Sequence, residues 1–158
     1  LPQLPSDIVL LAAGKIWDHN EIKGYPEDRF QHLGIVSDEL LTYYCKKSVA
    51  IVVPNIKSSD QTDVEGFGLV SLDAVARGGI VLASSIEGIV DAIKDTKTGF
   101  LLAPENPEVW VSKINEILEW NEDKRNLFDQ QASVNLKQYY SWNRVANDTV
   151  SVYKKYLQ

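Results

Sequence analysis

Residues 65–69 (Glu-Gly-Phe-Gly-Leu) form the segment whose residue types and spacing could bind a charged ligand. They follow an apolar run that ends near Pro54 and lead into a helical pattern that begins at Leu69. Glycine at Gly66 and Gly68 removes two side chains where the helix begins, so a ligand can approach the backbone closely. The first turn of a helix has unpaired N–H groups and the positive end of the helix dipole. The segment therefore predicts a diphosphate site.

Two carboxylates flank this predicted anion site. Glu65 would repel a phosphate, so its expected partner is a hydroxyl donor of a sugar or a developing positive charge. Asp73 follows eight residues later, about two helical turns along nearly the same face. Carboxylates that accept hydrogen bonds from diols, placed around such amides, predict a nucleotide sugar as the ligand.

Each feature also has a simpler interpretation. A Gly-x-Gly sequence at a strand-to-helix junction is most often only a turn. A glutamate before a helix is commonly a solvated charge that stabilises the helix dipole, and Asp73 alone is typical of surface charge. The combination of the three features and their order favours the binding site.

The rest of the chain alternates between two kinds of segment that would position this loop. Short apolar runs are typical of strands buried on both faces of a parallel sheet, and they cover residues 8–13, 49–53, 80–83 and 99–102, with 29–33 a weaker candidate. Helical patterns lie between them at residues 38–46, 69–77 and 87–94. This alternation predicts an α/β fold with a doubly wound, Rossmann-like parallel sheet. Ligands of such sheets bind at the carboxyl ends of the strands.

Three further helices are predicted at the carboxy-terminal end. Asn106 can cap the first, with Pro107 at its first position, and the second covers residues 123–139. The third begins after Ser141 and carries an apolar stripe made of Trp142, Val145, Val152 and Tyr156. Because no strand separates these helices, we expect them to pack on the outside of the sheet, and we expect the stripe to need a partner surface.

Composition excludes several classes of protein. The 158 residues predict one domain, residues 1–158, and 44% hydrophobic and 24% charged residues are typical of a globular protein. A net charge of -6 disfavours nonspecific electrostatic binding of nucleic acid. The single cysteine, Cys45, cannot form an internal disulfide framework or a cysteine-based zinc site, and is expected to be a small buried hydrophobe.

Membrane and metal sites are not expected either. The longest apolar run is too short to span a bilayer, and residues 1–7 lack the features of a signal peptide, so we expect a cytoplasmic location. His19 and His32 are the only histidines, and no second ligand type clusters around either. We therefore expect no metal, and a structural role for His32.

The ordered motifs resemble the carboxy-terminal, donor-binding domain of the retaining glycosyltransferases of the GT-B fold, a group that includes mannosyltransferases and sucrose synthase. The likeness covers roughly residues 7–156 and is strongest over 32–104. It rests on residues 30–41 (FQHLGIVSDELL), 50–54 (AIVVP), 65–84 (EGFGLVSLDAVARGGIVLAS) and 95–104 (DTKTGFLLAP).

The resemblance implies a role for individual residues. Glu65 matches the first glutamate of the family's Glu-x7-Glu motif, which contacts the transferred sugar, and it is the catalytic candidate. Asp73 matches the second glutamate, which holds the ribose hydroxyls. Donor-binding positions implied by the match also include Gly66, Phe67, Gly68 and Leu69 near the sugar and diphosphate, and Ile35 and Val36 near the base. The family needs no metal and no cofactor besides the donor.

The sequence departs from the family pattern at several places. Asp73 is one methylene shorter than the family's glutamate, a deficit of about 1.5 Å. Glu87 stands where the family often has glycine, and Asp91 where it often has glutamate. The family's Gly-Arg…Lys-Gly segment and its amino-terminal acceptor domain are absent from these 158 residues. The chain is therefore expected to be a fragment of a two-domain enzyme, inactive by itself.

The function implied by the resemblance is transfer of a hexosyl group from a UDP- or GDP-sugar to a saccharide or lipid-linked acceptor, with retention of anomeric configuration, as in cell-envelope polysaccharide synthesis. Acceptor binding and any peripheral membrane association would belong to the missing domain. Three alternatives remain open at this point. They are a degenerate nucleotide-sugar-binding module without catalysis, another GT-B enzyme such as an epimerase or an inverting transferase, and a plain doubly wound signalling domain.

Overall fold

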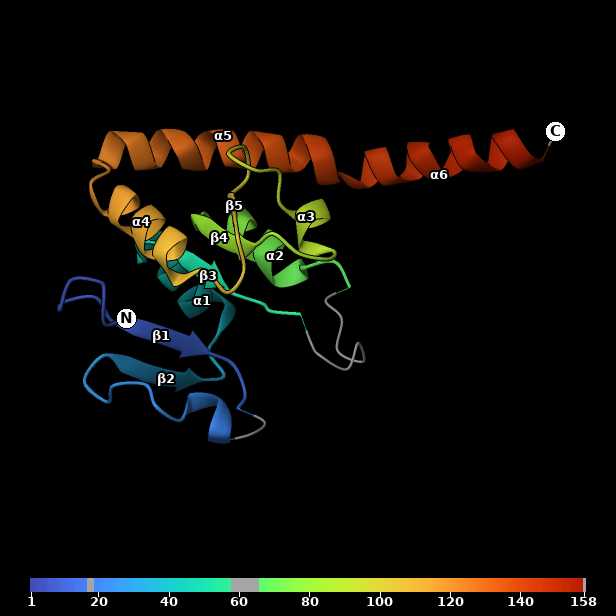
Figure 1. Ribbon diagram of the computed structural model, residues 1–158. Coiled ribbons are helices and arrows are strands. Elements are labelled where there is room, and N and C mark those ends of the chain that lie inside the picture. The colour runs from blue at the N-terminus through green and yellow to red at the C-terminus, as the bar shows by residue number, and fades with distance from the viewer. Residues whose placement is uncertain (17–18, 58–65, 158) are drawn as a thin grey trace.

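The computed structural model describes residues 1–16, 19–57 and 66–157. Strands and helices alternate along the first two thirds of the chain, and helices alone follow (Figure 1). The strands are β1 (Leu10–Ala13), β2 (Phe30–Gly34), β3 (Ile51–Val53), β4 (Val81–Ser84) and β5 (Phe100–Leu102). The helices are the short 3-10 helix η1 (His19–Ile22) and α1 (Asp38–Lys47), α2 (Leu69–Ala76), α3 (Ile89–Ala92), α4 (Pro107–Leu118), α5 (Glu122–Tyr140) and α6 (Trp142–Tyr156).

All strand pairs are parallel, which confirms the predicted α/β class. β1 pairs with β2, and β3, β4 and β5 form a second sheet with β4 at its centre. The weaker strand candidate at residues 29–33 is also confirmed, as β2. The strands of the described chain thus form two separate sheets, where the alternation predicted one.

The second sheet has a core on each of its faces. Alternate residues of β4 point to opposite faces, so Val81 and Ala83 join one apolar cluster and Leu82 joins the other. The first cluster receives side chains from α2, α3 and α5, and the second receives Ile117 from α4. Helices on both faces of a parallel sheet are the doubly wound arrangement.

Burial of the strands is uneven. All four residues of β4 are buried, whereas the residues of β3 and most of β1 are only half-buried and Ala13 is exposed. The prediction that residues 8–13 and 49–53 form strands buried on both faces is therefore wrong. The physical reason is that β1 has only β2 beside it, and β3 only β4, in the described part of the chain.

The predicted helix at residues 87–94 is a single turn, α3. Ile93 has an extended backbone with φ −102° and ψ 125°, so the helix ends before it. The next amide, that of Lys94, donates to the hydroxyl of Thr98 at 2.9 Å and not to a carbonyl one turn earlier. A side-chain acceptor therefore competes with the helix at this point.

The expected structural roles of Cys45 and His32 are confirmed. Cys45 is 4% exposed in the core cluster, and burial is the main cause that raises the pKa of its thiol. Nε2 of His32 in β2 lies 2.8 Å from the carbonyl oxygen of Gly14 and donates to it. The imidazole therefore connects the ends of β1 and β2.

The three carboxy-terminal helices differ in what they cover. α4 and α5 pack on the second sheet as predicted, whereas α6 continues beyond α5 away from the body of the molecule (Figure 1). The hydroxyl of Ser141 accepts the N–H of Arg144, which confirms the predicted cap of α6. No residue of α6 is buried, and Trp142 is 87% exposed, so the prediction that all three helices pack on the sheet is wrong for α6. No helix in the described part of the chain is long and apolar enough to cross a membrane.

A half-buried guanidinium connects α5 to the residues just before β3, and its removal should destabilise the fold. Arg125 donates from Nη2 to the carbonyl oxygens of Ser48 and Val49 at 2.7 and 3.0 Å. Burial lowers the pKa of Arg125. Because hydrogen bonds from a charged donor each contribute about 1.5–3 kcal/mol, we expect Arg125→Met to lower the free energy of unfolding in urea by about 2–3 kcal/mol. The control, Lys137→Met on the exposed face of α5, should change it by less than about 0.5 kcal/mol. Equal stability of the two variants would contradict the assigned role.

Candidate functional site

The loop before α2 is shaped by one glycine. Gly68 is the amino-terminal cap residue of α2 and has φ 76° and ψ 41°, a left-handed conformation that glycine adopts without strain. Its carbonyl accepts the N–H of Ser71 at 2.9 Å, which begins the helix. Helix geometry leaves the N–H groups of Leu69 and Val70 without partners within the helix. The side chains of Leu69 and Val70 in that turn are 69% and 68% exposed, so the turn lies open at the surface.

A side chain introduced at position 68 would affect the packing of the fold as well as the binding of a ligand. A Cβ there would lie 3.2 Å from Cγ1 and 3.3 Å from Cα of Ile89, in addition to the strain of a positive φ. A bulky substitution such as Gly68→Val would therefore disturb the packing of α2 on α3. Its effect on ligand binding alone would be uninformative.

Gly88, next to Ile89, contacts the same loop at Gly66 and Phe67. A Cβ at position 88 would lie 2.2 Å from the carbonyl oxygen of Gly66 and 2.7 Å from Cα of Phe67. The loop after β4 and the loop before α2 are therefore in direct backbone contact. The neighbouring Glu87 has φ 44°, a left-handed conformation, which accounts for the glycine that the resembling family often has there. The sequence analysis singled out Glu87 and missed Gly88.

An aromatic contact joins the loop to the end of α5. The ring of Phe67 meets the ring of Tyr140 edge to face, with 6.1 Å between the centroids. The hydroxyl of Tyr140 donates to the carbonyl of Asp91 in α3, and the ammonium of Lys94 lies 6.0 Å from the Tyr140 ring centroid. The backbone of residues 66–68 is thus supported by α3 and α5 and is not a free turn.

Asp73 is held by an arginine that the sequence analysis missed. Nε of Arg77 lies 2.8 Å from Oδ2 of Asp73, and its Nη2 lies 2.9 Å from Oδ1 of Asp38 at the start of α1. Nη1 of Arg77 also donates to the hydroxyl of Thr42 at 2.9 Å. The hydrogen bond to Asp73 is the main cause that raises the pKa of Arg77. The (i, i+4) spacing of Asp73 and Arg77 was a signal for this pair.

This network has two consequences for the site. It connects α1 to α2, so that Ile35 and Val36, which precede the cap residue Ser37 of α1, lie close in the chain to a helix that Asp38 and Arg77 join to Asp73. It also holds Oδ2 of Asp73 while its side chain remains 54% exposed. The carboxylate can therefore accept a further hydrogen bond from a ligand.

The predicted site residues fall into three groups. Gly66, Phe67, Gly68 and Leu69 lie together in one supported loop and helix start. Asp73 lies further along the same helix, while Ile35 is an apolar side chain with 85% exposure at the end of β2. The catalytic candidate Glu65 lies outside the described residues, so its role stays a prediction. Among the described residues, no three histidine, cysteine or acidic side chains gather in a group that could hold a metal.

Comparison with known proteins identifies the class. The family model "Glycosyl transferases group 1" matches residues 3–134, and the chain belongs to this family. It is 28% identical to an uncharacterized glycosyltransferase of Methanocaldococcus jannaschii over 93% of this chain and 36% of that protein. It is 30% identical to a D-inositol 3-phosphate glycosyltransferase of Nocardioides over 76% of this chain and 24% of that protein. The chain thus spans about a quarter to a third of the length of these relatives.

Solved structures show the same fold. A glycosyltransferase from Rickettsia africae superposes with a TM-score of 0.74 at 24% identity, over 96% of this chain and 41% of that one. HepE of Anabaena, solved in complex with UDP-glucose, superposes with a TM-score of 0.68 at 21% identity, over 95% of this chain and 42% of that one. These matches confirm the fold that the motifs implied, that of the GT-B glycosyltransferases.

The contact between Gly88 and the loop gives a test of how rigidly the loop is held. A methyl group at position 88 would overlap the Gly66 carbonyl, so the two backbones must move apart. We expect Gly88→Ala to lower the free energy of unfolding by about 1–3 kcal/mol, the usual cost of overpacking. The matched control is Gly66→Ala, where a Cβ meets nothing within 4 Å. Urea denaturation of both variants measures the difference, and an unchanged Gly88→Ala protein would show that the loop is free to shift.

Proposed function

We propose that the chain is the donor-binding domain of a retaining glycosyltransferase that moves a hexosyl group from a nucleotide sugar to a saccharide or lipid-linked acceptor. The observation that carries this proposal is the supported loop at residues 66–68, which opens onto the exposed first turn of α2, with Asp73 on the same helix. Membership of the glycosyltransferase family and the UDP-glucose bound to the fold relative HepE support it.

Each part of the site has a role in this proposal. The first-turn amides of α2 stabilise the charge on the departing diphosphate, because fixed N–H dipoles need no reorganisation as charge develops. The contacts of Gly88 and Tyr140 with the Phe67 loop keep those amides in place. Glu65 orients the transferred sugar through its hydroxyls, and the leaving phosphate receives the proton of the acceptor. We propose no cofactor and no metal beyond the donor itself.

Asp73 and Ile35 would bind the nucleoside part of the donor. The ribose hydroxyls donate to the carboxylate of Asp73, which Arg77 holds in one orientation. The base lies against Ile35 and Val36 at the end of β2, where Ile35 offers an exposed apolar surface. Fixing the carboxylate in advance lowers the entropy lost on binding.

A noncatalytic nucleotide-sugar-binding module is the second candidate function. The observation that favours it is the ion pair of Asp73 with Arg77, because one carboxylate oxygen is already engaged and the side chain is short. In this case the protein would bind the donor more weakly and transfer nothing. Assay of sugar transfer by the full-length protein separates the two candidates.

The role of Asp73 can be tested by a double-difference measurement. Calorimetry of Asp73→Ala with UDP should show binding weaker by about 1–3 kcal/mol, the usual contribution of a hydrogen bond to a charged group. The loss should disappear with 2′,3′-dideoxy-UDP, which lacks both hydroxyl donors. Asp148→Ala is the matched control, because Asp148 also pairs with an arginine four residues away, at 3.4 Å on α6. An equal loss with both nucleotides would assign Asp73 to the support of the fold and not to the ribose.

The role of Glu65 can be tested by comparing the affinity for a nucleotide sugar with that for the free nucleotide diphosphate. Because its proposed partner is the transferred sugar, Glu65→Gln should leave the affinity for UDP unchanged and weaken that for UDP-glucose or GDP-mannose, whichever the parent protein binds. Calorimetry with and without the sugar attached checks this expectation. A variant that loses affinity for the free diphosphate would contradict the assigned role.

A further inference from the structure

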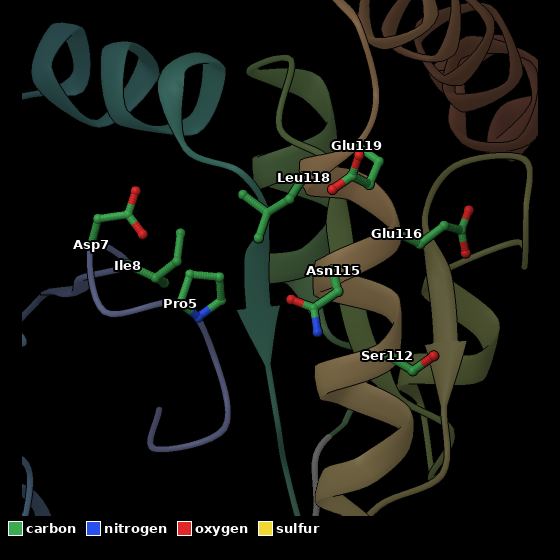
Figure 2. A pocket seen from close by; sticks show the side chains of 8 residues that line it. All are labelled: Pro5, Asp7, Ile8, Ser112, Asn115, Glu116, Leu118 and Glu119. Carbon is green, nitrogen blue, oxygen red and sulfur yellow. The ribbon is translucent and has the colours of Figure 1, made fainter.

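The candidate site is an open surface and not an enclosed pocket. A cavity of about 510 Å³ lies between α4 and the segment that leads into β1, where Pro5, Asp7 and Ile8 line it, and none of the described site residues does (Figure 2). The first turn of α2, in contrast, is exposed at Leu69 and Val70. A donor bound there is not enclosed by walls, so its affinity depends on how firmly the loop before α2 is held in the binding conformation.

Phe67 is the side chain through which that loop can be held. It lies between Gly66 and Gly68, and glycine loses more conformational freedom on folding than any other residue. The ring of Phe67 is 38% exposed and meets the ring of Tyr140 edge to face. An aromatic pair in this geometry contributes more than the area that it buries. Loss of the Tyr140 ring would therefore leave the loop less firmly held.

One face of α5 fixes where the ring of Tyr140 lies. Ala132 belongs to the first apolar cluster and Leu136 packs against it, and Tyr140 follows at the same spacing of four residues. The hydroxyl of Tyr140 donates to the carbonyl of Asp91 in α3. The Tyr140 side chain thus connects α5, α3 and the Phe67 loop.

The junction of α5 with α6 follows directly after Tyr140. Ser141 has φ −78° and ψ 145°, an extended backbone that separates the two helices. The carbonyl of Tyr139 lies in the last turn of α5, where carbonyl groups lack partners within the helix. Nη1 of Arg144 donates to this carbonyl at 3.1 Å. Arg144 therefore ties the first turn of α6 to the last turn of α5, next to Tyr140.

We propose that Tyr140 is a positioning residue for the donor, that it acts through Phe67, and that Arg144 sets its place from α6. Neither Tyr140 nor Arg144 has to touch the donor, because packed side chains and hydrogen bonds carry the connection. A change in the direction of α6 relative to α5 shifts the Tyr140 ring, and the loop before α2 shifts with it. This inference rests on the proposed function, since it assumes that a nucleotide diphosphate binds at the first turn of α2. It adds a connection from α6 to that site.

Calorimetry on the full-length protein tests Tyr140 against its neighbour, with UDP, or with GDP if the parent protein binds that instead. Tyr139→Leu is the matched control, because Tyr139 is also half-buried and Lys97 both donates to its hydroxyl and lies over its ring. We expect Tyr140→Leu to weaken binding by about 3- to 10-fold, the scale of an aromatic pair, and Tyr139→Leu to change it by less than about 2-fold. Tyr140→Phe keeps the ring and should restore the affinity of the parent.

A double-mutant cycle tests the path through Phe67. If Tyr140 acts on the donor through the Phe67 ring, Tyr140→Leu should cause no further loss of affinity once Phe67→Leu has removed that ring. An equal loss in both backgrounds would overturn this path. A general loss of stability would also appear in both backgrounds, so the cycle separates positioning from support of the fold.

The connection to α6 is tested at Arg144, whose side chain is 52% exposed, so that the variant is expected to fold even if Tyr140→Leu does not. Arg144→Met should weaken binding of the same nucleotide by at least about 2-fold, the loss of one modest hydrogen bond. Asp148→Ala is the control, because it removes the ion pair of Arg144 within α6 and leaves the bond to Tyr139. Equal affinities of these two variants would overturn the role of Arg144.

The outcomes separate this inference from the proposed function. A parent protein that binds UDP or GDP, with equal affinities in Tyr140→Leu and Tyr139→Leu, would overturn the role of Tyr140 and leave the proposed function standing. A parent protein that binds neither nucleotide would overturn both.

Discussion

The candidate site depends on the close approach of two backbones, at Gly88 and at Gly66–Phe67. No side chain fits between them, since a Cβ at position 88 would lie 2.2 Å from the Gly66 carbonyl. This contact holds the loop before α2 against the loop that follows the buried centre strand β4. The positive φ of Gly68 then turns the chain into α2, and the exposed first turn of that helix faces outward from a rigid support. The amides of that turn are therefore held in place before any ligand arrives, the condition that electrostatic stabilisation of a leaving group requires.

The pairing of Asp73 with Arg77 shows how this chain can use a shorter acidic side chain. An aspartate reaches about 1.5 Å less far than a glutamate, and Arg77 fixes its direction while also binding Asp38 at the start of α1. The guanidinium of Arg77 therefore fixes the direction of the Asp73 carboxylate and also holds α1 against α2. Both carboxylates are largely exposed to solvent, so the ion pairs contribute to orientation more than to stability.

Much of the fold followed from local patterns. Apolar runs with β-branched residues identified five parallel strands to within a few residues, and Ser141 and Pro107 marked two helix starts. The patterns could not show that the strands of the described residues divide into two sheets, because strand pairing joins residues far apart in the chain. Nor did they show that α3 is one turn, after which the hydroxyl of Thr98 accepts the N–H of Lys94. The amphipathic stripe predicted that α6 forms but not that it extends away from the sheet, because packing on the sheet depends on contacts between distant segments.

By itself the sequence determined the class of this protein and its candidate ligand site. The order of the glycine loop, Asp73 and the apolar runs is a property of the chain, and the match to the glycosyl transferases group 1 family confirms the class. Only the tertiary structure decided which groups support that site. Gly88 and Tyr140 reach the loop from other elements, and Arg77 binds Asp38 thirty-nine positions away. Contacts of this kind depend on distances in space between folded elements, which residue types and spacing along a chain do not specify.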